Sequence, residues 1–535
     1  MIYEIYPRSF ADADGDGTGD VRGIIARLPY LRDLGVDGVW IAPWYPSPLA
    51  DGGYDVSDHR GIHPALGTLE DAAELIDRAH ELGLRVVLDV VANHVSHEHP
   101  WFVEAAAAAP GSPARRRFHF RPGRGPDGDE PPNNWQSAFG GPAWTRLREP
   151  DGRPGEWYLH TFAPEQPDLA WDLEEVAAEY DEVLRHWLRL GVDGFRFDAV
   201  PALAKRPGLP DATAPAAHDG AQGPWLNDTH WDVDEVHAVL RRWRGVLDEG
   251  ERATGRSLVS VAEAVVRTPE RLARYVRPDE LHTAFNFDLV HAPWSARALR
   301  EAIEGSLAAL ASTGAPPTWS LSSHDETRHV TRFGRRPDGT LDLALGRRRA
   351  RAAALLLLGL PGSAYLYQGE ELGLEEVEDL PDHLRQDPVH HRSGGTVPGR
   401  DGCRVPLPWS GASAPFGFGP PGSTPWLPQP ERWAGLTAQA QADDASSMLA
   451  LYHRALALRR THPGFAGDGF AWVGQDDPDD QDAVVAFRRD AGVAVVVNLG
   501  ERPVELPGEV LLTSAPLLDG RLPGDAAAWV VANPA

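Results

Sequence analysis

The sequence predicts a (β/α)8 TIM barrel with a subdomain inserted after its third strand and an antiparallel β-domain at its C-terminus. Short apolar runs rich in β-branched residues alternate with helical segments along most of the 535 residues. Polar side chains directly follow several of these runs, and in a β/α barrel the C-terminal ends of the strands carry the catalytic groups. The pattern changes twice, once after the third strand and once near the end of the chain.

Eight strands are expected from apolar runs that are bounded by helices and turns. Their predicted ranges are 2–6, 36–41, 84–91, 192–197, 258–262, 282–287, 318–321 and 364–367. The helices between them show apolar residues at helical spacing, as in residues 176–188, which Gly191 ends. Thr68, followed three residues later by Asp71, is a capping signal for the helix that leads to the third strand.

Two segments lie outside the barrel pattern. One, after the third strand, is rich in Pro, Gly, Arg and Trp without a regular period, and a loop this long inside a compact domain is usually functional. Within it, residues 133–135 and 139–141 either line a substrate mouth or form a structural flap. The other segment shows alternating strands near the C-terminus. The expected division is a barrel of residues 1–94 and 166–462, an inserted subdomain of 95–165 and a C-terminal β-sandwich of 463–535.

The composition excludes several classes of protein. The 78 acidic residues against 51 basic ones give a net charge of −27, which repels the phosphates of nucleic acid and of anionic membranes. No run approaches the roughly 20 apolar residues that a membrane-spanning helix needs. Cys403 is the single cysteine, so no internal disulfide forms, and the chain starts without a basic and apolar leader. We therefore expect a cytoplasmic monomer or homodimer that binds neither nucleic acid nor membrane.

Polar clusters at the predicted strand ends carry the candidate chemistry. They lie in residues 89–94, 194–198, 261–263 and 322–325, after strands three, four, five and seven. Two carboxylates on separate strands, Asp198 and Glu263, are the minimum equipment for cleaving a glycosidic bond. Arg196 points to the same side of its strand as Asp198 and favours the ionised carboxylate that a nucleophile needs. Glu263 is flanked by apolar residues, which raise the pKa of a carboxyl and suit a proton donor.

With these motifs the chain resembles glycoside hydrolase family 13, the α-amylase family, and within it the bacterial α-glucosidase and oligo-1,6-glucosidase branch. The likeness extends over essentially the whole length and rests also on residues 2–10, 53–58, 166–169 and 367–371. It implies that Asp198 is the nucleophile, Glu263 the general acid/base and Asp325 the stabiliser of the transition state. The glucose ligands that it implies are Asp51, Tyr54, His94, Phe162, Arg196, His324 and Arg404, with Asp51 and Arg404 closing a blind, exo-acting pocket and Tyr54 stacking on the sugar ring.

Four positions bear on the details of the substrate subsites. Ser323 and Ala170 stand where the family usually has Asn, and Leu407 stands where it often has Met. None of these departures removes a catalytic carboxylate. In this branch Val after the nucleophile accompanies α-1,6 bonds, whereas Thr or Ala accompanies α-1,4 bonds, so Ala199 predicts a preference for maltose-type substrates.

An acidic loop near the N-terminus predicts a structural metal ion. Its candidate ligands are the carboxylates of Asp12, Asp14, Asp16 and Asp20 and the carbonyl of Thr18. Acidic residues at alternate positions resemble the first part of a calcium loop, although Gly23 stands where the bidentate glutamate is expected. The resemblance implies Ca²⁺ or Mg²⁺ here, and the alternative is a merely solvated acidic loop. No organic cofactor is expected.

The function that follows is that of a retaining exo-α-glucosidase. We expect it to hydrolyse terminal α-glucosidic bonds, preferably α-1,4, of maltose and short malto-oligosaccharides through a covalent glucosyl–Asp198 intermediate. A transglucosylase, a disaccharide isomerase or an α-1,6-glucosidase would use the same residues. A non-catalytic binding scaffold is a further alternative, against which the presence of all three carboxylates argues.

Overall fold

The computed structural model describes residues 1–213, 229–473 and 483–532. Eight parallel strands form one sheet in the order β10-β11-β1-β2-β3-β7-β8-β9. They are β1 (Ile2–Ile5), β2 (Gly38–Ile41), β3 (Arg85–Val90), β7 (Gly194–Phe197), β8 (Val259–Ala262), β9 (Thr283–Ala284), β10 (Thr318–Ser320) and β11 (Ser363–Tyr367). A parallel bridge between Phe285 and Thr318 joins the two edges and closes the barrel. The predicted barrel is confirmed.

The sixth strand is shorter than the sequence predicts. Residues 282–287 form only the two-residue strand β9, and helix α8 (Phe287–His291) begins where the strand was expected to end. Asn286 is the N-cap, because its side chain accepts a hydrogen bond from the backbone N of Asp288. Such a cap favours a helix over a continued strand.

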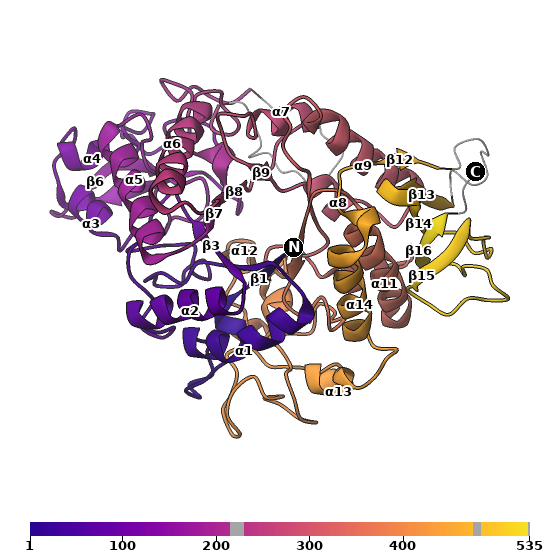
Figure 1. Ribbon diagram of the computed structural model, residues 1–535. Coiled ribbons are helices and arrows are strands. Elements are labelled where there is room, and N and C mark those ends of the chain that lie inside the picture. The colour runs from indigo at the N-terminus through magenta and orange to yellow at the C-terminus, as the bar shows by residue number, and fades with distance from the viewer. Residues whose placement is uncertain (214–228, 474–482, 533–535) are drawn as a thin grey trace.

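Helices cover the outside of the barrel (Figure 1). The long ones are α1 (Val21–Leu34), α2 (Leu69–Glu81), α5 (Glu174–Leu190), α6 (Val236–Thr254), α9 (Ala296–Leu310), α11 (Leu343–Gly359) and α14 (Met448–Thr461). The short ones are α7 (Pro269–Arg274), α10 (His329–Gly334), α12 (Pro388–Arg392) and α13 (Ala438–Ala442). Thr68 and Asp71 form the predicted capping box at the start of α2. None of the helices in the described ranges is long and apolar enough to cross a bilayer.

The segment after β3 forms a unit of its own at the side of the barrel opposite the C-terminal strands (Figure 1). It contains helices α3 (Pro100–Ala107) and α4 (Pro113–Arg116) and an antiparallel sheet of β4 (Phe120–Arg121), β5 (Trp144–Arg148) and β6 (Pro154–Leu159). Asn133 and Trp135 are buried in it, and Asn133 Oδ1 accepts hydrogen bonds from Trp135 N and Trp144 Nε1. Asn133 and Trp135 therefore contribute to the packing of this unit, whereas Asn134 between them is exposed.

A single lysine ties this unit to the barrel. Lys205, in the loop after β7, places Nζ 2.9 Å from Asp168 Oδ2 and 2.9 Å from Asn93 Oδ1. Asn93 follows β3 and Asp168 lies where the chain returns to the barrel. The contact therefore fixes both ends of the inserted unit against the loop that follows the predicted nucleophile.

The C-terminal domain is one five-stranded antiparallel sheet in the described residues, ordered β12-β13-β14-β16-β15. Its strands are β12 (Ala471–Trp472), β13 (Val484–Arg488), β14 (Val493–Asn498), β15 (Gly508–Thr513) and β16 (Ala526–Ala532). One face packs on α11, where Trp529 Nε1 donates to the carbonyl of Leu355 at 2.9 Å. The predicted antiparallel β-domain is confirmed, but in the described residues it is one sheet rather than the expected sandwich, because a barrel helix covers this face in place of a second sheet.

Candidate active site

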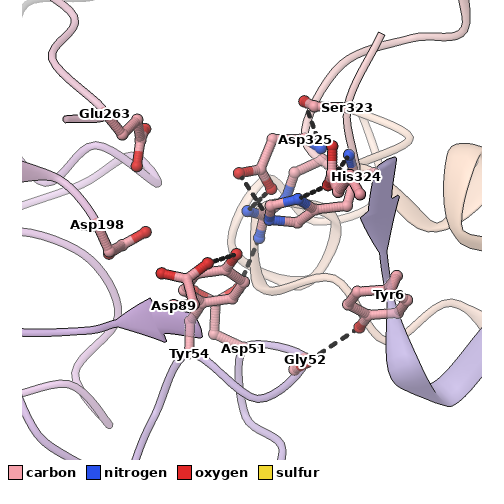
Figure 2. Close-up of polar contacts among 12 residues, drawn as sticks. Tyr6, Asp51, Gly52, Tyr54, Asp89, Asp198, Glu263, Ser323, His324 and Asp325 are labelled. Atoms are coloured by element: carbon pink, nitrogen blue, oxygen red, sulfur yellow. Dashed lines mark hydrogen bonds and ion pairs between the residues drawn. The ribbon is translucent and has the colours of Figure 1, made fainter. Parts of the chain in front are cut away.

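The two predicted catalytic carboxylates lie on neighbouring strand ends. Asp198 directly follows β7 and Glu263 directly follows β8. The two strands are paired with Phe197 opposite Ala262, so the next residue of each strand leaves the sheet at the same level. Figure 2 shows both carboxylates on one side of the site, with Asp325 facing them from the other.

One guanidinium connects these carboxylates. Arg196 Nη1 lies 2.5 Å from Asp198 Oδ1 and 2.9 Å from Asp89 Oδ1, and its Nη2 lies 2.6 Å from Glu263 Oε2. Asp89 is the register partner of Arg196 on β3, which explains the third contact. The sequence predicted the pairing of Arg196 with Asp198 but not the contact with Glu263, which depends on the order of the strands.

Burial and crowding set the protonation of this cluster. Burial raises the pKa of Glu263 to about 7, against the lowering effect of Arg196 and with the support of the nearby Asp198 charge. Burial also raises the pKa of Asp198 to about 6, and Arg196 opposes this rise. Three carboxyls share one guanidinium and titrate as a coupled set near neutral pH, in which the proton favours the group with the highest pKa. That group is Glu263.

The pKa of Glu263 is raised, as the sequence predicted, but the cause differs from the expected one. The residues adjacent in sequence are apolar, but the carboxylate itself contacts Arg196 and the backbone N of Ala199 at 3.0 Å. The rise comes from burial and from the other acids, because the contacts with Arg196 and Ala199 lower the pKa.

Asp325, unlike Glu263, is held in its ionised form. Burial acts to raise its pKa, but His324, Arg400 and Arg404 outweigh that effect and hold the pKa well below its ordinary value. Arg400 Nη1 lies 2.9 Å and Arg404 Nη2 lies 2.8 Å from Asp325 Oδ1. Asp325 therefore presents a negative charge opposite Asp198 and Glu263.

Arg400 links the predicted pocket residue Asp51 to Asp325. Its Nη2 lies 2.6 Å from Asp51 Oδ1, and its Nε lies 2.5 Å from the buried Asp387. Arg404, which the resemblance implied closes the pocket together with Asp51, contacts Asp325 and the carbonyl of His324. Arg400 is a candidate site residue that sequence reasoning missed, although two arginines four residues apart in one segment were the available signal.

The remaining predicted glucose ligands lie together on the side of the candidate site next to Asp51. Tyr54 is 4% exposed, its hydroxyl donates to Asp89 Oδ2 at 3.0 Å, and its ring stacks on His324 at a centroid distance of 5.1 Å. His94 Nε2 lies 3.0 Å from the carbonyl oxygen of Tyr54, and the His94 ring packs edge-on against Phe162. Gln166 Nε2 donates to Asp51 Oδ2 at 3.0 Å, which adds a further residue to this side of the site.

Two of the remaining predicted positions have clear local environments. Ala199 is 4% exposed, has a left-handed backbone (φ 43°) and packs with Ala202 and Trp231. Ser323 Oγ accepts a hydrogen bond from the backbone N of Asp325 at 3.1 Å. Ser323 therefore shapes the turn that presents Asp325, in place of the asparagine that the family usually has.

The acidic loop brings three carboxylates together. Oxygens of Asp12, Asp14 and Asp20 lie within 4.8 Å of one another. Asp16 is not in this group, and its Oδ1 accepts instead from the backbone N of Thr18 at 2.7 Å. Asp20 also caps α1 through the backbone N of Gly23. Three hard oxygen donors at this spacing fit Ca²⁺ or Mg²⁺.

A closed β/α barrel with two carboxylates on adjacent strand ends and a third opposite them defines a glycoside hydrolase. The chain belongs to the α-amylase family: the model of the α-amylase catalytic domain matches residues 4–468.

Relatives place the chain in the α-glucosidase branch of that family. It is 34% identical to the oligo-1,6-glucosidase of Parageobacillus thermoglucosidasius, over 97% of this chain and 93% of that protein. It is 38% identical to a probable α-glucosidase of Rhizobium meliloti (strain 1021), over 87% and 83%. The crystal structure of an α-glucosyl transfer enzyme matches with a TM-score of 0.87 and 35% identity, covering 100% of this chain and 98% of that one.

Proposed function

We propose that the protein is a retaining exo-α-glucosidase acting on maltose and short malto-oligosaccharides. The observation that carries this proposal is the contact of one guanidinium, that of Arg196, with both Asp198 and Glu263. A shared partner keeps the two carboxyls close. Retaining enzymes need a short separation of about 5–5.5 Å, whereas inverting enzymes leave roughly 6.5–9.5 Å for a water molecule.

The roles follow from the charges. Glu263, with a pKa of about 7, holds the proton that the leaving oxygen requires. Asp198 attacks the anomeric carbon as the carboxylate, forming a β-glucosyl ester while the bond to the leaving oxygen breaks and Glu263 transfers its proton to that oxygen. Glu263 then takes a proton from water, which displaces Asp198 and releases α-glucose. Asp325 stabilises the positive charge that develops on the sugar ring.

The link through Arg400 supports exo attack. Because Arg400 links Asp51 to Asp325, a sugar chain that extended past the terminal glucose would meet this ion-pair network rather than an open groove. The small side chain of Ala199 supports the preference for α-1,4 bonds. We also propose that Asp12, Asp14 and Asp20 hold a structural Ca²⁺ or Mg²⁺ ion, without a part in the reaction.

The test is glucose release from maltose and isomaltose in parallel, with the product anomers followed by NMR. Early α-glucose from maltose, faster than from isomaltose, is the expected result. The leaving glucose carries the anomeric mixture of the maltose reducing end, so retention is judged from the glucose released beyond that mixture. An early excess of β-glucose over it would overturn retention, and faster cleavage of isomaltose would overturn the linkage preference. Asp198→Asn should abolish turnover while the thermal unfolding curve stays that of a folded protein.

A second function, glucosyl transfer to another sugar, is favoured by one observation. The solved structure described above as an α-glucosyl transfer enzyme matches the whole chain. Transfer differs only in the acceptor that resolves the glucosyl–Asp198 ester. New disaccharides formed from maltose without an equivalent amount of free glucose would identify this activity in the same experiment.

A further inference from the structure

His324 is held between two aromatic rings and a buried carboxylate. Its ring lies parallel to those of Tyr6 and Tyr54, at centroid distances of 5.9 and 5.1 Å and interplanar angles of 8° and 5°. Glu4 of β1 accepts at Oε1 from the backbone N of His324 at 3.1 Å and faces its Nδ1 at 2.5 Å. Glu4 is 2% and His324 1% exposed. The Glu4 contact therefore requires the proton on Nδ1.

The second ring nitrogen of His324 faces the site. Nε2 lies 3.1 Å from Asp325 Oδ2. Within the described residues it has no aligned hydrogen-bond acceptor. A neutral ring with its proton on Nδ1 would turn the lone pair of Nε2 towards the Asp325 carboxylate, which repels it. A protonated Nε2 is attracted to the same carboxylate. Its N–H has no well-aligned acceptor in the described part of the protein and can therefore donate a hydrogen bond to a ligand.

We propose that Glu4 is a positioning residue that keeps His324 as the doubly protonated imidazolium, so that Nε2–H donates to a hydroxyl of the bound glucoside. This inference rests on the proposed function of the site. Glu4 does not reach the substrate. It acts through Nδ1 of His324, and the flat faces of Tyr6 and Tyr54 stabilise the ring cation that results.

The charges around His324 support the cation. The titratable groups near its ring are Glu4 and Tyr6 from β1 and its end, Tyr54 from the loop after β2, Asp89 from β3 and the adjacent Asp325. The segment after α12 adds Arg400, which contacts Asp325, and Cys403 and Arg404, which contact the backbone carbonyl of His324. Burial acts to lower the pKa of His324, but Asp325 and Glu4 outweigh it and raise the pKa to about 9. Arg404 contacts the backbone carbonyl of His324 and not its ring.

The direct test measures the ring without any turnover. Protein labelled with ¹⁵N at histidine is titrated from pH 5 to pH 10 by NMR, and the His324 signals are assigned by their loss in His324→Gln. We expect both ring nitrogens of His324 to remain protonated at pH 8. We expect Glu4→Gln to move the titration down by about one pH unit or more, because the amide still accepts the hydrogen bond but carries no charge. A wild-type His324 that is neutral at pH 7, or an unchanged titration in Glu4→Gln, would overturn the proposal.

Kinetics separate this role from a merely structural one. Between pH 7 and 9 the loss of the Glu263 proton gives the wild-type plot of log kcat/KM against pH a slope of −1. In Glu4→Gln a second proton is lost between pH 7 and 9, so the slope approaches −2. A parallel fall at all pH values would mean that Glu4 serves only the packing and would overturn the inference.

Glu371→Gln is the matched control. Glu371 is another buried carboxylate, 1% exposed, but its partners are the hydroxyls of Tyr3 and Tyr30 and the backbone N of Gly369. Its slope should stay at −1. If the protein cleaves no α-glucoside at all, the proposed function fails, while the NMR titration still decides whether Glu4 sets the charge of His324.

Discussion

The guanidinium of Arg196 lies 2.6 Å from the carboxylate of Glu263 on the neighbouring strand. The same guanidinium binds Asp198 at 2.5 Å, so the proposed acid/base and the proposed nucleophile are coupled through one cation. Protonation of one carboxyl therefore changes the charge that the other experiences, and the cluster titrates as a unit.

The coupled pair predicts a narrow pH optimum. The nucleophile must be ionised, so activity is lost as the pH falls through about 6, the pKa of Asp198. The acid must be protonated, so activity is lost as the pH rises through about 7, the pKa of Glu263. A plot of kcat/KM for maltose should be bell-shaped, with apparent values near 6 and 7 that belong to the pair. A flat profile from pH 5 to 9 would contradict the charge assignment.

Removal of Arg400 should affect substrate binding and catalysis together. Arg400→Ala leaves Asp51, Asp325 and Asp387 as neighbouring acids without their common partner. Loss of one member of a buried ion pair destabilises a protein by up to about 3–5 kcal/mol, so the melting temperature should fall, and the uncompensated acids beside the substrate should lower kcat/KM by about 10²-fold. Steady-state kinetics on maltose measure this loss.

Arg392→Ala is the control for that variant. Arg392 lies near the same loops but hydrogen-bonds backbone carbonyls of Phe139 and Gly140 rather than the site acids. Its kcat/KM should change by less than about tenfold. Equal losses in the two variants would show that Arg400 has no special part in the pocket.

Ala199 should control linkage preference. Ala199→Val enlarges the side chain that follows Asp198 and should raise the ratio of isomaltose to maltose cleavage by about tenfold, the scale of a change of one or two methyl groups in a pocket. Because φ at this position is 43°, a β-branched residue is strained, and the melting temperature should also fall.

Ala199→Gly separates these two effects. Glycine adopts the left-handed backbone without strain and adds no atoms to the pocket. The variant should keep the preference for maltose and should not share the loss of thermal stability caused by valine. An unchanged maltose preference in Ala199→Val would show that this residue does not control linkage specificity.

The acidic loop predicts sensitivity to chelation. If Asp12, Asp14 and Asp20 hold a cation, removing it leaves three carboxylates within 4.8 Å of one another and lowers the melting temperature by several degrees. Calorimetry with EDTA and with added Ca²⁺ measures the change. Asp14→Asn should abolish the response, because it removes one of the three carboxylates. Asp14 is the exposed member of the group, so this substitution should disturb the fold least. An identical melting curve with and without EDTA would end the metal proposal.

Much of the fold was predictable because it depends on local patterns. Apolar runs ended by glycines and capping residues placed all eight strands, and the polar residues directly after those runs identified Asp198, Glu263 and Asp325. The error at β9 had a local cause too, because the side chain of Asn286 caps a helix that apolar residues alone do not distinguish from a strand.

The sequence by itself determined the barrel, the C-terminal sheet and the chemical identity of the candidate catalytic groups, since each follows from residue type and spacing along the chain. Only the tertiary structure decided which groups meet. The contacts of Arg196 with Glu263, of Arg400 with Asp51 and of Glu4 with His324 join residues 67, 349 and 320 positions apart. Such contacts depend on strand order and on the approach of distant loops, and they set the charges on which the proposed reaction depends.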